Sequence, residues 1–92
     1  MAITVRFSSA FQDLTHGKKT FLVDGDRLSK VLDDLEGQVP GLKTNLLNGE
    51  GKIHLAYHVI LIRGHTQELC QDLDCRIEDG DELVIAPIIS GG

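Results

Sequence analysis

The residues best suited to chemistry in this 92-residue chain are at its carboxyl terminus, which reads Ser90-Gly91-Gly92. Glycine has no Cβ, so the last two residues can enter a channel too narrow for other residues. We expect residues 87–92 to form an extended, flexible tail, because Pro87 cannot donate a hydrogen bond to a sheet ladder. Six extended residues span about 20 Å. Such a tail could carry its own carboxylate into another protein's active site, and an ordinary frayed terminus is the alternative.

Other residue types that support catalysis or metal binding are scattered along the chain. Cys70 and Cys75 do not have the Cys-x-x-Cys spacing, so small half-buried residues are favoured over a disulfide or a reactive thiol. The carboxylates of Asp79, Asp81 and Glu82 are more typical of a solvated turn than of a metal site. No catalytic residue and no metal site is therefore predicted. Four histidines lack the spacing of a helical ligand pair and are expected on the solvent side: His16, His54, His58 and His65.

The composition narrows the class of protein. The formal net charge is −5 and no basic stripe is present, so nucleic-acid binding is not expected. An acidic surface is compatible with docking onto a basic patch of a partner. No apolar run reaches membrane-spanning length, and residues 1–6 alternate like a strand rather than resembling a signal peptide. We therefore expect a cytoplasmic protein that does not contact a membrane.

The first half of the chain predicts two strands and a helix. Residues 2–7 alternate between apolar and polar side chains, and residues 20–23 form a second strand that pairs with the first as a hairpin. The segment 8–17 between them is expected to be a polar connection. Asp26 is a candidate helix cap, and Gly37 is a candidate stop. The intervening helix has one apolar stripe, formed by Leu28, Val31, Leu32 and Leu35.

The second half predicts further strands. A short helical piece at 42–47 and a loop at 48–52 precede an apolar run, 55–62, that is typical of a central strand. Residues 66–78 are expected to be a loop with weak strand character. The last strand, 83–86, is apolar on both faces and should lie inside the sheet. Together these elements predict an α+β domain over residues 1–86, with a mixed sheet of four to five strands packed on one main helix.

The segment from Asp79 to Gly92 resembles the end of the ubiquitin-like β-grasp sulfur carriers, which include ThiS, MoaD and CysO. The shared features are an Asp-Gly-Asp-Glu turn, a short apolar strand, a proline and a terminal Gly-Gly. The order of strands and helix extends the resemblance over essentially the whole chain. The loop at 48–54 is similar to that of CysO-type carriers, and the Pro-x-x-Ser-Gly-Gly ending also suits MoaD-type subunits. The resemblance implies the β-grasp fold.

The resemblance also implies a function. A ThiF/MoeB-like enzyme would use ATP and magnesium to adenylate the Gly92 carboxylate, so this chain itself would bind no cofactor. A sulfur donor (rhodanese-like, desulfurase or metal-linked) would then form a thiocarboxylate, which an acceptor synthase would use in sulfur amino acid or molybdopterin biosynthesis. The chain would be a carrier, or the small subunit of a synthase, rather than an enzyme. The partners would recognise the tail, namely Pro87, Ile88, Ile89, Ser90 and Gly91.

Two other functions fit the same ending. A ubiquitin-like modifier would be joined to lysines through Gly92, because an adenylated carboxylate also reacts with amines. A plain β-grasp interaction domain would make the terminal Gly-Gly incidental. The sulfur carrier is the favoured hypothesis of the three.

Overall fold

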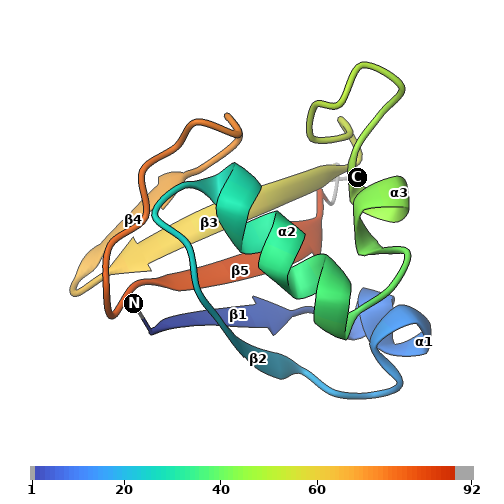
Figure 1. Ribbon diagram of the computed structural model, residues 1–92, viewed down its shortest axis with the longest axis horizontal. Coiled ribbons are helices and arrows are strands. Elements are labelled where there is room, and N and C mark those ends of the chain that lie inside the picture. Colours follow the sequence, from blue (N-terminus) through green and yellow to red (C-terminus); the bar gives the residue numbers. More distant parts are fainter. Residues whose placement is uncertain (1, 89–92) are drawn as a thin grey trace.

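The computed structural model describes residues 2–88, which form one mixed sheet with a long helix across one face (Figure 1). The strands lie in the order β2-β1-β5-β3-β4. Helix α2 spans Leu28–Gln38, and the shorter α3 spans Leu42–Leu46. This arrangement confirms the predicted α+β fold. The strand bounds are β1 Ile3–Phe7, β2 Thr20–Val23, β3 Tyr57–Arg63, β4 Thr66–Leu69 and β5 Glu82–Pro87.

The last strand, β5, is at the centre of the sheet. It pairs in parallel with β1 on one side and antiparallel with β3 on the other. The antiparallel pairs β1–β2 and β3–β4 complete the two halves of the sheet. Apolar residues on both faces of β5 predicted this interior position, and the structure confirms it.

The core lies between α2 and the sheet face that it covers. The four residues of the predicted helix stripe are all buried, as is the inward row of each of the three middle strands. Because a helix of eleven residues is marginal alone in water, α2 depends on this packing. The inward residues of β1, β3 and β5 are Ile3, Val5, Phe7, Val59, Leu61, Leu83 and Ile85.

Residues 8–17 are not the polar connection that the sequence predicted. They form a 3-10 helix, η1 (Ser9–Phe11), and a short helix, α1 (Gln12–Thr15). The Ser8 hydroxyl accepts a hydrogen bond from the backbone N–H of Ala10, which caps the first turn. Phe11 is buried, with its ring 5.4 Å from that of Phe7. Phe11 and Leu14 are the only large apolar residues of this short segment and give no extended periodic pattern, so the sequence could not reveal this insertion into the core.

Both predicted ends of α2 are also wrong. Asp26 makes no side-chain cap, because backbone carbonyls already accept the first helical N–H groups: Leu28 N donates to Cys75 O at 3.0 Å, and Ser29 N donates to Leu73 O at 2.9 Å. Gly37 does not stop the helix, which runs one residue further. The helix start is therefore held by a segment far away in the sequence.

The strands of the second half differ from the predicted bounds, and β5 extends the predicted strand 83–86 by one residue at each end. β3 starts at Tyr57 rather than at residue 55, and Leu55 is 89% exposed. The segment 66–78, predicted as a loop, supplies the edge strand β4 before it crosses to the start of α2. All four residues of β4 are exposed, which explains why no apolar alternation marked it.

Gly25 is required where the chain passes the first turn of α2. Its φ is +150°, and a Cβ there would lie 2.8 Å from Val31 N and 3.0 Å from Lys30 C. We expect Gly25→Ala to lower the free energy of unfolding by about 2 kcal/mol, because the backbone atoms it meets cannot move aside. The matched variant Gly37→Ala has open space on an exposed helix turn and should raise stability by about 0.5–1 kcal/mol. Urea denaturation of the two variants checks this, and equal stabilities would contradict it.

Candidate functional site

The tail leaves the domain later than the sequence predicted. β5 includes Pro87, which faces Tyr57 of β3, and the backbone N–H of Ile88 donates to Ala56 O at 2.8 Å. Two of the residues assigned to the tail therefore lie along the sheet. The remaining four, residues 89–92, lie outside the described part of the chain, and so do the predicted roles of Ile89, Ser90, Gly91 and Gly92.

Pro87 fits this place because no donor is needed from it. The hydrogen bonds between β5 and the β1 side end where Ser8 N donates to Ile85 O, so Pro87 has a neighbouring strand on one side only. On the β3 side, Tyr57 N donates to His54 O rather than to Pro87. Proline is tolerated at such a strand end.

Aromatic rings surround the point where the tail leaves. The Tyr57 ring lies 5.2 Å from that of Phe11 and 5.9 Å from that of His54. His54 Nδ1 accepts a hydrogen bond from Ala56 N at 3.0 Å, which fixes the backbone that in turn binds Ile88. These contacts give the start of the tail a defined direction.

The sheet face away from α2 carries an apolar surface close to this exit. Since successive residues of a strand point to opposite faces, the residues between the buried ones of β3 and β5 lie on this outer face. Ile60 is in register with Val84 on one side and with Leu69 on the other. Leu69 is 64% exposed. We call this surface the outer patch, and its residues are Ile60, Ile62, Leu69, Val84 and Ala86.

The Asp-Gly-Asp-Glu turn has a structural role. The Asp79 carboxylate accepts from Ala2 N, Gly80 N donates to Ala2 O at 3.0 Å, and Thr4 N donates to Asp81 O at 3.2 Å. Gly80 has a φ of +87°, as predicted for a tight turn. The motif therefore fastens the start of β1 and sets the start of β5, from which the tail follows.

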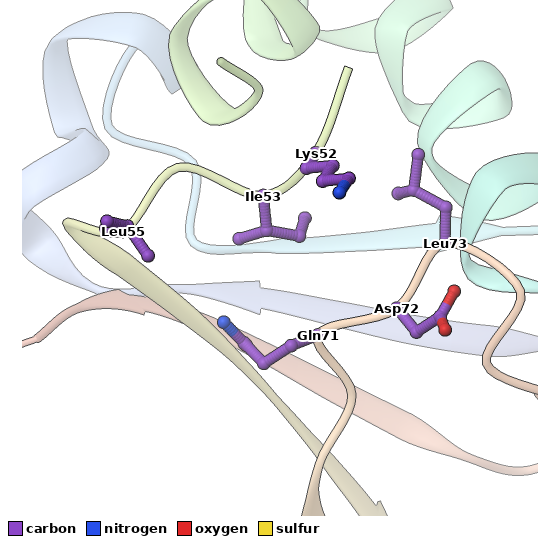
Figure 2. A pocket seen from close by; sticks show the side chains of 6 residues that line it. All are labelled: Lys52, Ile53, Leu55, Gln71, Asp72 and Leu73. Carbon is purple, nitrogen blue, oxygen red and sulfur yellow. The ribbon is translucent and has the colours of Figure 1, made fainter. Parts of the chain in front are cut away.

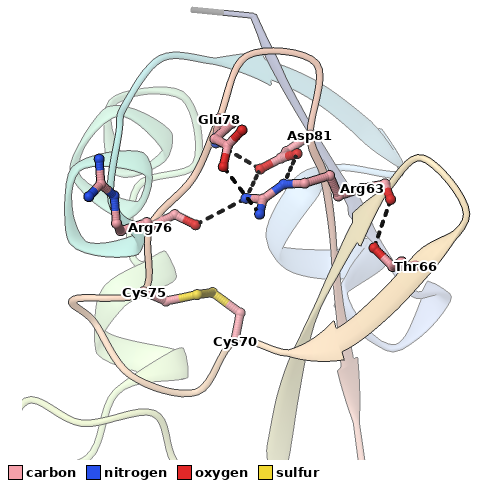
Figure 3. A network of polar contacts seen from close by, with 7 residues as sticks. All are labelled: Arg63, Thr66, Cys70, Cys75, Arg76, Glu78 and Asp81. Carbon is pink, nitrogen blue, oxygen red and sulfur yellow. Dashed lines mark hydrogen bonds and ion pairs between the residues drawn. A yellow bond between two sulfur atoms is a disulfide. The ribbon is translucent and has the colours of Figure 1, made fainter.

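Asp81 also holds Arg63 at the end of β3 (Figure 3). Arg63 Nε and Nη2 donate to the two Asp81 carboxylate oxygens at 3.0 and 2.8 Å, and Asp81 is 2% exposed. The hydrogen bonds from Arg63 hold the pKa of Asp81 below its ordinary value, with desolvation opposing them, and the pKa of Arg63 is raised in turn. Glu78 adds a more exposed ion pair to Arg63 at 3.3 Å.

A groove lies between the loop before β3 and the segment after β4 (Figure 2). Three apolar and three polar side chains line it: Lys52, Ile53, Leu55, Gln71, Asp72 and Leu73. Within residues 2–88, no three His, Cys, Asp or Glu side chains are grouped in a way that could hold a metal ion. Three of the four histidines are exposed, and His58 is half-buried on the outer face.

The favoured interpretation of the two cysteines is wrong. Cys70 and Cys75 form a disulfide, with their Cα atoms 5.9 Å apart (Figure 3). Cys70 is buried, whereas Cys75 is partly exposed. A spacing of five residues fits both a bonded and an unbonded pair, so only the path of the chain could decide between them.

Sequence reasoning also missed residues that shape the site. Arg63 carries no signal in the sequence, because no spacing links it to Asp81, eighteen residues later. Ala56 binds the tail through its carbonyl, which no side-chain pattern can show. Gln71 bonds the β3 backbone with both amide atoms and carried no signal either.

The fold and the tail exit define a ubiquitin-like β-grasp carrier, and comparison with known proteins supports this class. No family model matches the chain. The sulfur carrier protein CysO of Mycobacterium tuberculosis is 30% identical over 94 residues, covering the whole of both proteins. A chain of the Amycolatopsis orientalis BexX/CysO complex is 29% identical with a TM-score of 0.85, covering 99% of this chain and 100% of that one. This chain belongs to the CysO family of sulfur carrier proteins, and it is a carrier rather than an enzyme.

A more distant likeness shows how widely the fold is used. The small archaeal modifier protein SAMP1 of Haloferax volcanii is 24% identical with a TM-score of 0.75, and the whole of both chains is covered. At this identity the likeness shows the fold alone. Among the described residues, no helix is long and apolar enough to cross a membrane.

Proposed function

We propose that Gly92 is the residue that carries sulfur. A carboxylate with a pKa near 3.5 is ionised at neutral pH and resists attack by a nucleophile. A ThiF/MoeB-like partner would join it to AMP from ATP and release pyrophosphate. A sulfur donor would then displace AMP and leave a thiocarboxylate. The observation that carries this proposal is the family membership of a chain whose sequence reads Gly91-Gly92 at its carboxyl end.

The contact of Ile88 with Ala56 limits how far the carboxylate can reach. Residues 89–92 separate this contact from the Gly92 carboxylate, and four extended residues would span about 14 Å. The partner's catalytic centre must therefore come within about this distance of the exit beside Tyr57. A partner that adenylates the Gly92 carboxylate must therefore dock on the domain.

The outer patch is the surface best placed for this docking. Ile60 and Val84 lie three residues along their strands from the Tyr57–Pro87 pair, which corresponds to about 10 Å. The patch is apolar and uncharged, whereas the chain as a whole carries a net charge of −5. We propose that the activating enzyme covers this patch with an apolar surface.

Leu69→Asp should raise the KM of the activating enzyme for the carrier at least about tenfold, because a buried unpaired carboxylate would oppose docking. Leu22→Asp is the matched control. Leu22 is similarly exposed on the same face, but it lies on edge strand β2, beyond Thr4 and Arg6. The KM of the activating enzyme for the Leu22→Asp variant should stay within about twofold of the value for the wild-type carrier. Pyrophosphate release measured with each variant checks this, and equal KM values for the two would exclude the outer patch as the docking surface.

The acceptor and the location complete the proposal. Likeness to CysO carriers over the whole chain supports delivery of sulfur into sulfur amino acid biosynthesis, with molybdopterin biosynthesis as the second candidate. The need for ATP supports a cytoplasmic location. Sulfur transfer to candidate acceptors from the purified thiocarboxylate form would separate the two pathways.

A further inference from the structure

The disulfide between Cys70 and Cys75 closes a small ring of the chain, residues 70–75, between β4 and the start of α2. This ring holds the amino terminus of α2. Leu73 O and Cys75 O accept the hydrogen bonds from Ser29 N and Leu28 N, the first free donors of the helix. These two hydrogen bonds cap the amino terminus of α2, which has no side-chain cap. The ring is therefore part of the fold rather than a free loop.

The ring also covers the end of the β3 edge that β4 leaves unpaired. Gln71 Oε1 accepts from Val59 N at 2.6 Å, and Gln71 Nε2 donates to Tyr57 O at 3.3 Å. In addition, Cys70 N donates to Val59 O at 2.8 Å. Tyr57 is the residue that faces Pro87 at the tail exit, so the ring reaches the strand beside that exit.

The same ring forms one wall of the groove in Figure 2. Three of the six residues that line the groove lie within the ring, namely Gln71, Asp72 and Leu73. The opposite wall belongs to the loop before β3. The position of the ring therefore sets the shape of the groove as well as the start of α2.

We propose that Cys70–Cys75 is a reversible disulfide, opened by a thiol reductant, whose redox state controls the order of the ring. Disulfides that form in the cytoplasm are usually transient or redox-sensing rather than permanent. This inference goes beyond sulfur carriage and rests on the proposed location only. Cys75 is the more exposed of the two residues, so its sulfur is the one that an incoming thiolate meets.

The exchange reaction is balanced by the reductant. One reductant thiolate bonds to Sγ of Cys75, and the bond between the Cys75 and Cys70 sulfurs breaks. The Cys70 thiolate then takes up a proton. A second reductant thiolate then attacks the reductant sulfur in this mixed disulfide, and the Cys75 thiolate that is released takes up a proton. The protein gains two electrons and two protons, and the reductant becomes a disulfide.

Opening the ring should loosen its contacts with α2 and β3. The six-residue ring gains freedom in the unfolded chain when the bond is broken, so Tm should fall by roughly 10 °C on reduction. Hydrogen exchange at the Leu28 and Ser29 amides should accelerate at least about tenfold, because their acceptors lie in the ring.

The test compares the full chain after equilibration in oxidised glutathione and in a large excess of reduced glutathione, with thiols then trapped by alkylation and counted by mass. The double variant Cys70→Ser/Cys75→Ser is the matched control, and its Tm and amide exchange should not respond to glutathione. We expect the wild-type pair to be bonded in the first buffer and open in the second, with the stated shifts. A pair that stays bonded in reduced glutathione, thiols that remain free in the oxidised buffer, or equal exchange at Leu28 and Ser29 in the two states would each overturn the proposal. No step of this test uses sulfur transfer, so its failure leaves the carrier function untouched.

Discussion

Deleting Gly92 should reduce adenylation of the carrier by more than about 100-fold, because the carboxylate then ends one residue short of the partner's catalytic centre. A misplacement of about 1 Å can already cost a factor of that size, and one extended residue is about 3.4 Å long. Pyrophosphate release with the activating enzyme measures this effect. The Tm of the variant should equal that of the wild type, since the core lies within residues 3–85.

Deleting Ser90 instead is the matched control for this prediction. It keeps the terminal Gly91-Gly92 pair but shortens the reach from Ile88 by the same one residue. We expect a loss of roughly tenfold, because lengthening the tail again requires breaking the hydrogen bond between Ile88 and Ala56. Adenylation of either shortened chain at the wild-type rate would contradict the reach argument.

Asp81→Ala should lower the free energy of unfolding by about 3 kcal/mol, which corresponds to a fall in Tm of roughly 15 °C. The buried carboxylate accepts two hydrogen bonds from Arg63 and one from Glu78 N, and its removal leaves these donors without their partner. Glu78→Ala is the matched control, because Glu78 also pairs with Arg63 but is largely exposed. Its Tm should stay within about 3 °C of the wild-type value. Equal effects of the two variants, read by thermal unfolding, would refute the structural role of the motif.

The same ion pair predicts a dependence on pH. Because the pKa of Asp81 is lower in the folded protein than its ordinary value of 3.8, its ionised form stabilises the fold above that pH. This stabilisation is lost as the pH falls through the lowered pKa. The difference in unfolding free energy between wild type and Asp81→Ala should therefore be constant near neutral pH and shrink below about pH 4. A difference that grows on acidification would contradict the assignment.

The parts of the fold that sequence reasoning predicted are those with a local pattern. The stripe of α2 repeats with the period of a helix, and β1 alternates with the period of a strand, so each residue's neighbours along the chain reveal its environment. β5 was placed inside the sheet for the same reason, since both of its faces are apolar. Gly80 lies in the Asp-Gly-Asp-Glu segment that the sequence indicates as a turn, and its positive φ agrees with a turn.

The parts that were missed depend on contacts between distant segments. The cap of α2 comes from the carbonyls of Leu73 and Cys75, more than forty residues later, so no residue near Asp26 signals it. The pairing of Arg63 with Asp81 likewise joins the ends of two strands. At the tail, Pro87 stays in the sheet because the neighbouring strand β3 needs no hydrogen-bond donor from it. This depends on the register between the two strands rather than on residue type.

The measurement that tests the central claim most directly is the intact mass of the protein after reaction with its activating enzyme, ATP and a sulfur donor. Replacing oxygen by sulfur adds nearly the same mass as oxidation of a methionine or a cysteine, so fragmentation must locate the change. We predict that the added mass lies on Gly92 and is absent when Gly92 is deleted. An unmodified terminus after adenylation, or lysine conjugates formed through Gly92 in its place, would contradict the sulfur carrier account.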